Sequence, residues 1–270
     1  MNILVCVKQV PDVAEITIDP ITKTLIRRGV PTIVNPMDLN GIETAVQLKE
    51  QNPDTSITLV SMGPPAAEEA LREGIAMGAD DAYLLTDRAF AGSDTLATSY
   101  ALVTTIKHIE ELKGEKFDLI ITGNMAIDGD TGQVGPEIAA HMGWPQATYG
   151  IGVEKKDDDT LLVKRSHEMG YEVIEMKLPC VLSVIREINN PRRGTVRSKI
   201  AAKRSKIEWI STKVLGEKIN MDKIGLAGSP TSVVSADPPE GRTRGEDVTG
   251  KDAKESVANL MAKLAENELM

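Results

Sequence analysis

The sequence predicts an α/β protein with a doubly wound, mostly parallel sheet and an antiparallel edge. Short apolar runs separated by segments of helical periodicity indicate buried parallel strands, at 3–7, 57–62, 82–85 and 118–122. From residue 147 the pattern changes to period two, which predicts antiparallel edge strands, and the apolar run 181–185 returns to the main sheet. After Trp209 the chain is rich in Gly, Pro, Ser and Asp, which predicts an extended arm.

The helices follow from start and stop signals. Asn35 or Asp38 is expected to cap a helix, a second ends at Gly78, and a third begins at the Ser93-Asp94 pair. Residues 13–34 alternate apolar and polar positions, which predicts a hairpin-like excursion. We expect an α/β domain over 1–210, followed over 211–270 by the arm and an amphipathic C-terminal helix that lie on a partner.

Composition limits the functional classes. A net charge of −9 argues against a general nucleic-acid surface, which needs clustered positive charge. The sequence has no apolar run of 18 residues, so we expect no membrane span. The apolar run near its start is too short for a secretory signal, so we expect a cytoplasmic location. Two distant cysteines in apolar runs predict buried free thiols, and three scattered histidines predict no metal site.

The segment after the 118–122 strand carries the strongest chemical signal. A loop of small and polar residues, 123–133, separates that strand from a helix predicted near Val134. Such loops bind phosphates because backbone N–H groups and the helix dipole face the anion. Thr131 and Gln133 add donors, whereas Asp128 and Asp130 would repel phosphate and are expected to cap the helix or orient the loop. An ordinary strand-to-helix connection is the alternative.

Two other stretches are ambiguous or negative. Residues 186–206 carry eight Arg or Lys against one acid, Glu187, which predicts either a solvated helix face or a docking or anion site. The segment 245–251 resembles a Walker A loop, but Asp252 replaces the required Ser or Thr and no buried strand precedes it. We therefore do not interpret it as a phosphate site, and we identify no catalytic acid–base pair.

Several segments resemble the β subunit of electron transfer flavoproteins. The segment NMAIDGDTGQVGPEIAAHMGWPQATY is similar to the family's nucleotide-binding segment, and further similar segments follow the same order over nearly the whole chain: ILVCVKQVPD, VNPMDLNGIETAVQLKE, VKRSHEMGYEVIEMKLPCVLSVIREINNPR and ADPPEGRTRG. The resemblance implies a sheet of the adenine-nucleotide-binding type. It also implies a cofactor, because in such proteins the flavin supplies the redox chemistry.

Within the family, the loop AIDGDTGQVGP resembles the electron-bifurcating branch, in which this subunit holds FAD; shuttle members hold AMP and usually have a bulkier residue at the Gly129 position. Arg186 is interpreted as stabilising a reduced flavin. The resemblance implies these cofactor-binding residues: Cys6, Asn35, Pro36, Met37, Asp38, Met62, Leu119, Gly123, Asn124, Met125, Asp128, Gly129, Asp130, Thr131, Gly132, Gln133, Val134 and Arg186.

The resemblance also implies partners. An α subunit would carry a second FAD, NADH would deliver a hydride, and the electrons would divide between a flavin-dependent acyl-CoA or lactate-type dehydrogenase and ferredoxin or flavodoxin. NADH oxidation is then expected only in the complex. The dehydrogenase would dock on the basic stretch, through Arg192, Arg193, Val196, Arg197 and Lys199. Two alternatives stay open: an AMP-binding shuttle subunit and a stand-alone stress-type nucleotide-binding module.

Overall fold

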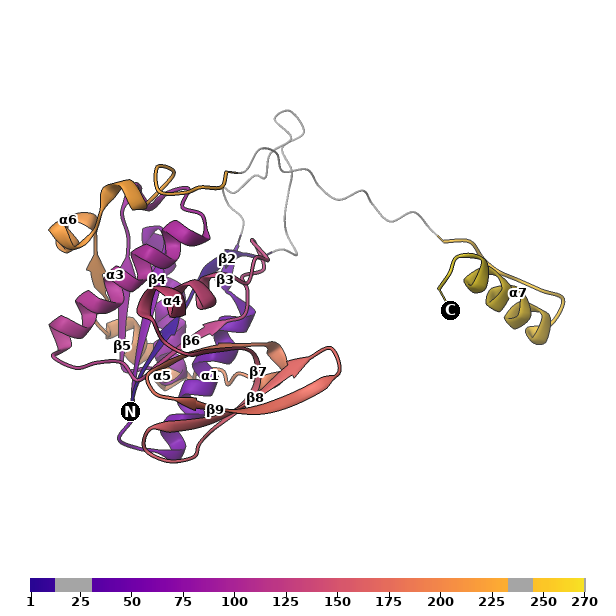
Figure 1. The fold of residues 1–270 in the computed structure, drawn as a ribbon, viewed down its shortest axis with the longest axis horizontal. Coiled ribbons are helices and arrows are strands. Elements are labelled where there is room, and N and C mark those ends of the chain that lie inside the picture. The colour runs from indigo at the N-terminus through magenta and orange to yellow at the C-terminus, as the bar shows by residue number, and fades with distance from the viewer. Residues whose placement is uncertain (13–30, 233–244, 270) are drawn as a thin grey trace. The chain divides into compact units, whose positions relative to one another are not determined.

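The computed structural model describes residues 1–12, 31–232 and 245–269 (Figure 1). The chain forms two compact units, Met1–Val234 and Ser235–Met270. The first unit contains the sheet and the site, and the described residues of the second, 245–269, contain one helix.

A nine-stranded sheet forms the centre of the first unit, in the order β11-β5-β4-β1-β6-β10-β7-β8-β9. The strands from β11 to β7 run parallel, and β7, β8 and β9 pair antiparallel at one edge, as the two periodicities predict. Their bounds are β1 Asn2–Cys6, β4 Ser56–Met62, β5 Asp81–Leu85, β6 Leu119–Gly123, β7 Gln146–Lys155, β8 Thr160–His167, β9 Gly170–Lys177, β10 Cys180–Val184 and β11 Glu208–Ile210.

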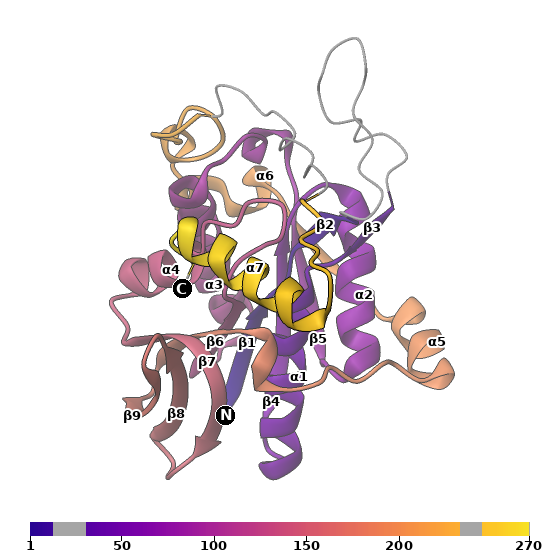
Figure 2. The same cartoon turned by 90° about the vertical axis from the view of Figure 1, so that its right-hand side faces the viewer.

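Helices cover both faces of this sheet, which confirms the doubly wound fold (Figure 2). Alternate residues of β1 face opposite sides: Ile3 and Val5 pack in the core with α1 and α2, and Leu4 packs in the core with α3 and α4. A further helix, α5, packs against α2. The bounds are α1 Pro36–Gln51, α2 Glu68–Met77, α3 Thr95–Lys113, α4 Val134–Met142 and α5 Val196–Arg204.

Local signals explain where the helices begin and end. The side chain of Asp94 accepts a hydrogen bond from the Ala97 N–H at the start of α3, and Gly78 ends α2 with a φ of 134° that favours glycine. Both were predicted. The residues β2 Gln9–Pro11 and β3 Thr32–Val34 form a small antiparallel pair. The remainder of the expected hairpin-like excursion, 13–30, lies outside the described residues.

The α/β domain extends past its expected boundary at residue 210. Strand β11 pairs with β5, and the short helix α6 Thr212–Leu215 follows it. Leu215, Ile219 and Ile224 are buried in the core that α3 and α4 share. Because burial of these side chains stabilises the fold, residues 211–224 belong to the α/β domain rather than to an arm.

The second unit contains α7 Ala253–Glu266, where the sequence predicts a helix. The Asp252 carboxylate caps its first turn at Glu255 N–H, 2.8 Å away. None of its residues is buried within the described chain, and Val257, Leu260 and Met261 are exposed. Over the described residues, no helix is both long and apolar enough to cross a membrane.

Candidate functional site

The main pocket lies at the carboxyl ends of β1, β4 and β6. The chain leaves β1 toward β4 and β5 and then returns to β6 on the other side of β1, so the strand order reverses here. Open α/β sheets bind ligands at such a point because adjacent loops diverge and leave a crevice. The pocket has a volume of about 360 Å³, which is within the range of small-molecule sites.

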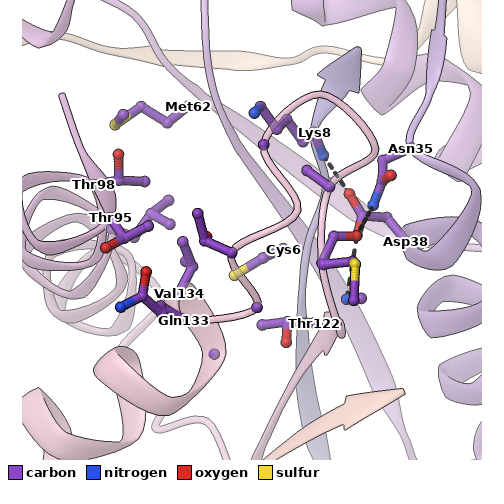
Figure 3. Close-up of a pocket in the computed structure, with 18 of the residues that line it drawn as sticks. Cys6, Lys8, Asn35, Asp38, Met62, Thr95, Thr98, Thr122, Gln133 and Val134 are labelled. Atoms are coloured by element: carbon purple, nitrogen blue, oxygen red, sulfur yellow. Dashed lines mark hydrogen bonds between the residues drawn. The ribbon is translucent and has the colours of Figure 1, made fainter. Parts of the chain in front are cut away.

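Most of the predicted cofactor-binding residues line this pocket (Figure 3). Cys6 and Met62 are the last residues of β1 and β4, and Asn35 and Asp38 lie at the start of α1. The rest come from the end of β6, the loop after it and the start of α4: Gly123, Asn124, Met125, Gly129, Asp130, Thr131, Gly132, Gln133 and Val134.

Other predicted residues lie elsewhere. Leu119 is fully buried at the amino end of β6, paired with Ile3 and Cys180, so it faces the core at the wrong end of the strand; that interpretation needs correction. Pro36 and Met37 lie in the first turn of α1 and are not among the pocket-lining residues. Arg186 follows β10, is exposed, and is absent from the pocket wall. Asp128 supports the wall from outside.

Asp38 holds three segments of the pocket together. Its carboxylate accepts hydrogen bonds from the Lys8 N–H at 2.7 Å, the Asn35 amide at 2.9 Å and the Gly123 N–H at 3.2 Å. Burial raises the pKa of Asp38 to about 7, although the three donors favour the ionised form. The side chain therefore fixes the ends of β1 and β6 to the start of α1.

The loop after β6 is fixed by Asn35 and Lys8. The Asn35 amide donates to Met125 O at 3.0 Å and its oxygen accepts from the Ile127 N–H at 3.3 Å. The Lys8 ammonium contacts the Asp128 carboxylate at 2.7 Å. Asp128 thus orients the loop, which is one of the two expected roles. The other expectation, that Asp128 or Asp130 caps α4, is wrong. Gln133 occupies the cap position, without a side-chain hydrogen bond.

The amino end of α4 presents free donors to the pocket. Among the described residues, no acceptor is found for the backbone N–H groups of Thr131, Gly132, Gln133 and Val134. Asp130 and Gly132 have φ of 52° and 63°, left-handed values that turn the backbone sharply just before α4. Together with the helix dipole, the donors make an anion site that suits a phosphate.

Gly135 brings α4 close to the sheet. A Cβ atom at this position would lie 2.3 Å from Ser183 Oγ and 2.7 Å from Thr122 Oγ1, two hydroxyls that share a buried hydrogen bond of 2.9 Å. Only glycine therefore permits this approach. The close packing aims the first turn of α4 at the pocket.

Sequence reasoning missed the opposite wall. Ser93, Asp94, Thr95 and Thr98, from the start of α3, line the pocket, and Lys8 adds a cation. Figure 3 shows Thr95 and Thr98 on one side of Cys6 and Asn35 and Asp38 on the other. From the sequence, the Ser93-Asp94 pair is expected only as a helix cap. Its position after a parallel strand was the available signal, because that places it at the same sheet edge.

The protein's own side chains supply little chemistry in the pocket. Burial, and secondarily the charge of Asp38, raises the pKa of the Cys6 thiol, so it stays protonated. Cys6 and Cys180 are both free thiols; Cys180 is buried, as predicted, whereas the residue Cys6 is only partly buried. No group of His, Cys, Asp or Glu in the described chain could hold a metal ion. The pocket instead offers backbone donors that suit a phosphate-bearing ligand.

Comparison with known proteins agrees with this geometry. Residues 22–213 match the electron transfer flavoprotein domain. The chain is 48% identical over 267 residues, 98% of each protein, to an electron transfer flavoprotein β subunit of Clostridium acetobutylicum. The chain belongs to the electron transfer flavoprotein family. It is also 46% identical over the full length of both chains to the Megasphaera elsdenii β subunit, and 44% identical, again at full length, to the caffeyl-CoA reductase-Etf complex subunit CarD of Acetobacterium woodii.

These matches identify the chain as a β subunit of an electron transfer flavoprotein, which implies an α subunit as partner. Family members bind a flavin or AMP, and the pocket has donors for either. The match over nearly the whole chain argues against the stand-alone stress-type module.

The predicted docking residues of this β subunit do not behave alike. Arg192 is held inside the chain: its guanidinium binds the buried Glu43 at 2.7 and 2.9 Å and Glu50 at 2.6 Å. Arg193, Val196, Arg197 and Lys199 are exposed on and before α5. Val196, at 78% exposure, and Ile200, at 50%, lie one turn apart on this basic helix.

Proposed function

We propose that this β subunit holds FAD in the pocket and acts in flavin-based electron bifurcation with its α subunit. The observation that carries the proposal is Gly129, which lines the pocket and has no heavy atom within 4 Å of the position that a Cβ would occupy. A phosphate bound at the start of α4 can therefore continue past Gly129 as a diphosphate. A larger residue there would close this direction.

The residues present fit a dinucleotide. Unpaired N–H groups at Thr131 to Val134 would bind the phosphates, and Asp38 and Asn35 would keep the loop in place. When bound, FAD would supply the redox chemistry, namely hydride acceptance from NADH and single-electron transfer to the α-subunit FAD and to ferredoxin or flavodoxin. The protein's part is binding, orientation and exclusion of side reactions.

Delivery to the dehydrogenase is proposed to use α5. Its exposed Val196 and Ile200 give an apolar contact, and Arg193, Arg197 and Lys199 surround it with positive charge. An acidic patch on a flavin-dependent acyl-CoA or lactate-type dehydrogenase would complement this surface. Arg192 instead keeps the preceding segment on α1 through Glu43. The exposed apolar stripe of α7 is proposed to pack on the α subunit.

The second candidate is an AMP-holding shuttle subunit, because the same phosphate donors would bind a monophosphate. Substitution Gly129→Asp separates the two in the purified αβ complex. The new side chain would fill the diphosphate path and add a like charge, so FAD per heterodimer should fall from about two to about one. Gly245→Asp is the matched control, since a Cβ at Gly245 also meets no atom within 4 Å. Unchanged flavin content in Gly129→Asp would reject FAD in this pocket.

A further inference from the structure

The pocket that would bind an anionic nucleotide is itself rich in carboxyl groups. Asp38, Asp94 and Asp130 line it, whereas Lys8 is the one cation among its described lining residues. Phosphates would be repelled by these carboxylates unless a positive charge compensates. The N–H donors of α4 carry only partial charges, so the ammonium of Lys8 is the strongest attraction available.

The Lys8 side chain lines the pocket and contacts the loop that carries Gly129. Its backbone N–H is fixed by Asp38 at 2.7 Å, two residues after β1, while its side chain is 47% exposed. The ammonium contacts Asp128, the residue next to Gly129, at 2.7 Å. The contact places the positive charge beside the open path at Gly129. A surface ion pair of this kind is worth little, because solvent screens it.

We propose that Lys8 is a phosphate ligand of the nucleotide and that Asp128 is its resting partner. The proposal rests on the proposed function, since it needs a nucleotide in the pocket. On binding, the ammonium would exchange the screened carboxylate for a phosphate that is already held by the N–H groups of α4. A charge-assisted bond to a phosphate inside the pocket is stronger than the exposed pair that it replaces.

The alternative is that the pair only ties the loop to β1. The two roles predict opposite results for the two partners. If Lys8 is a phosphate ligand, Lys8→Gln weakens nucleotide binding, whereas Asp128→Asn frees the ammonium and strengthens it. If the pair is only a tether, both substitutions break the same contact and both weaken binding.

The test uses the complete αβ complex, depleted of the nucleotide of the β subunit and titrated with FAD and separately with AMP by calorimetry. We expect Lys8→Gln to raise Kd about tenfold and Lys8→Arg to keep it within about threefold. Asp128→Asn should lower Kd about two- to fivefold, and this gain should shrink in the Lys8→Gln background because the two residues are coupled. Lys156→Gln is the matched control, since Lys156 also forms an exposed ion pair, with Glu175, at the antiparallel edge of the sheet.

The outcomes separate the two proposals. Wild-type complex that binds neither FAD nor AMP would overturn the proposed function. If the wild-type complex binds nucleotide and Lys8→Gln binds it as tightly as Lys156→Gln does, only the role of Lys8 would be overturned. If Lys8→Gln and Asp128→Asn weaken nucleotide binding equally, the pair only tethers the loop, and the proposed role of Lys8 is likewise overturned. Thermal unfolding of each variant reports any general loss of structure.

Discussion

The carboxylate of Asp38 accepts a hydrogen bond from the backbone N–H of Gly123 at 3.2 Å. The two residues are 85 positions apart in the chain, one at the start of α1 and the other at the end of β6. The bond is possible because residue 123 is a glycine. A Cβ atom there would lie 2.3 Å from Asp38 Oδ1 and would clash with it. The pocket thus depends on a polar bond between the start of α1 and the end of β6 as well as on core packing.

Replacing Asp38 by Asn should loosen this junction. An amide offers one acceptor oxygen instead of two, so its NH₂ group would face the N–H of Lys8 as a second donor. We expect a loss of about 1–3 kcal/mol in the free energy of unfolding, measured by urea denaturation, and a lower nucleotide content. Asp158→Asn, on a fully exposed side chain, is the control. Equal stability of the two variants would contradict the role of Asp38.

The raised pKa of Asp38 gives stability a specific pH dependence. Burial raises this pKa from 3.8 to about 7, so between about pH 4 and pH 7 the folded state binds more protons at Asp38 than the unfolded state. The contribution of Asp38 to the free energy of unfolding therefore decreases as pH rises through this window. The stability difference between wild type and Asp38→Asn should shrink from pH 4 to pH 7. A difference that grows with pH would show that the hydrogen-bond donors outweigh burial.

Gly135→Ala should disturb α4. Its Cβ would press on Ser183 Oγ and Thr122 Oγ1, so helix and sheet must separate at the phosphate-binding end. We expect about 1–3 kcal/mol lower stability and weaker nucleotide retention. Gly135→Ala combined with Ser183→Ala should recover part of both, since the nearer clash is removed. No recovery in the double variant would mean that close packing at Ser183 is not the cause.

Val196→Asp and Arg197→Glu should slow electron delivery to the dehydrogenase without loss of flavin. Both side chains are exposed, so folding should be unaffected, while an added negative charge opposes docking on an acidic partner. The rate of dehydrogenase reduction should fall about tenfold and become less sensitive to salt. Val214→Asp, on the exposed Val214 of α6, is the control. A rate equal to that of the control would place docking elsewhere.

Much of the fold was predictable because its signals are local. The strand, glycine-rich loop and helix of 118–142 follow each other in sequence, and their apolar periods identify them directly. Lys8 and the start of α3 both lie at the carboxyl edge of the sheet. That placement depends instead on strand order, which is set by contacts between distant segments. The same applies to Arg192, whose partner Glu43 lies 149 positions away.

The extent of the domain was misjudged for a similar reason. Strand β11 has three residues, too few for a periodic signal, and the composition after it predicts a loop. Leu215, Ile219 and Ile224 are nevertheless buried. Leu119 was assigned to the site on resemblance, although the strand direction places it at the opposite end from the pocket.

The most direct test of FAD in this pocket is the cofactor content of the native complex. The αβ complex would be purified without added nucleotide, its mass measured under native conditions, and FAD and AMP counted after denaturation. Two FAD and no AMP per heterodimer is the expected result. One FAD with one AMP would contradict the account and identify the subunit as part of an electron shuttle.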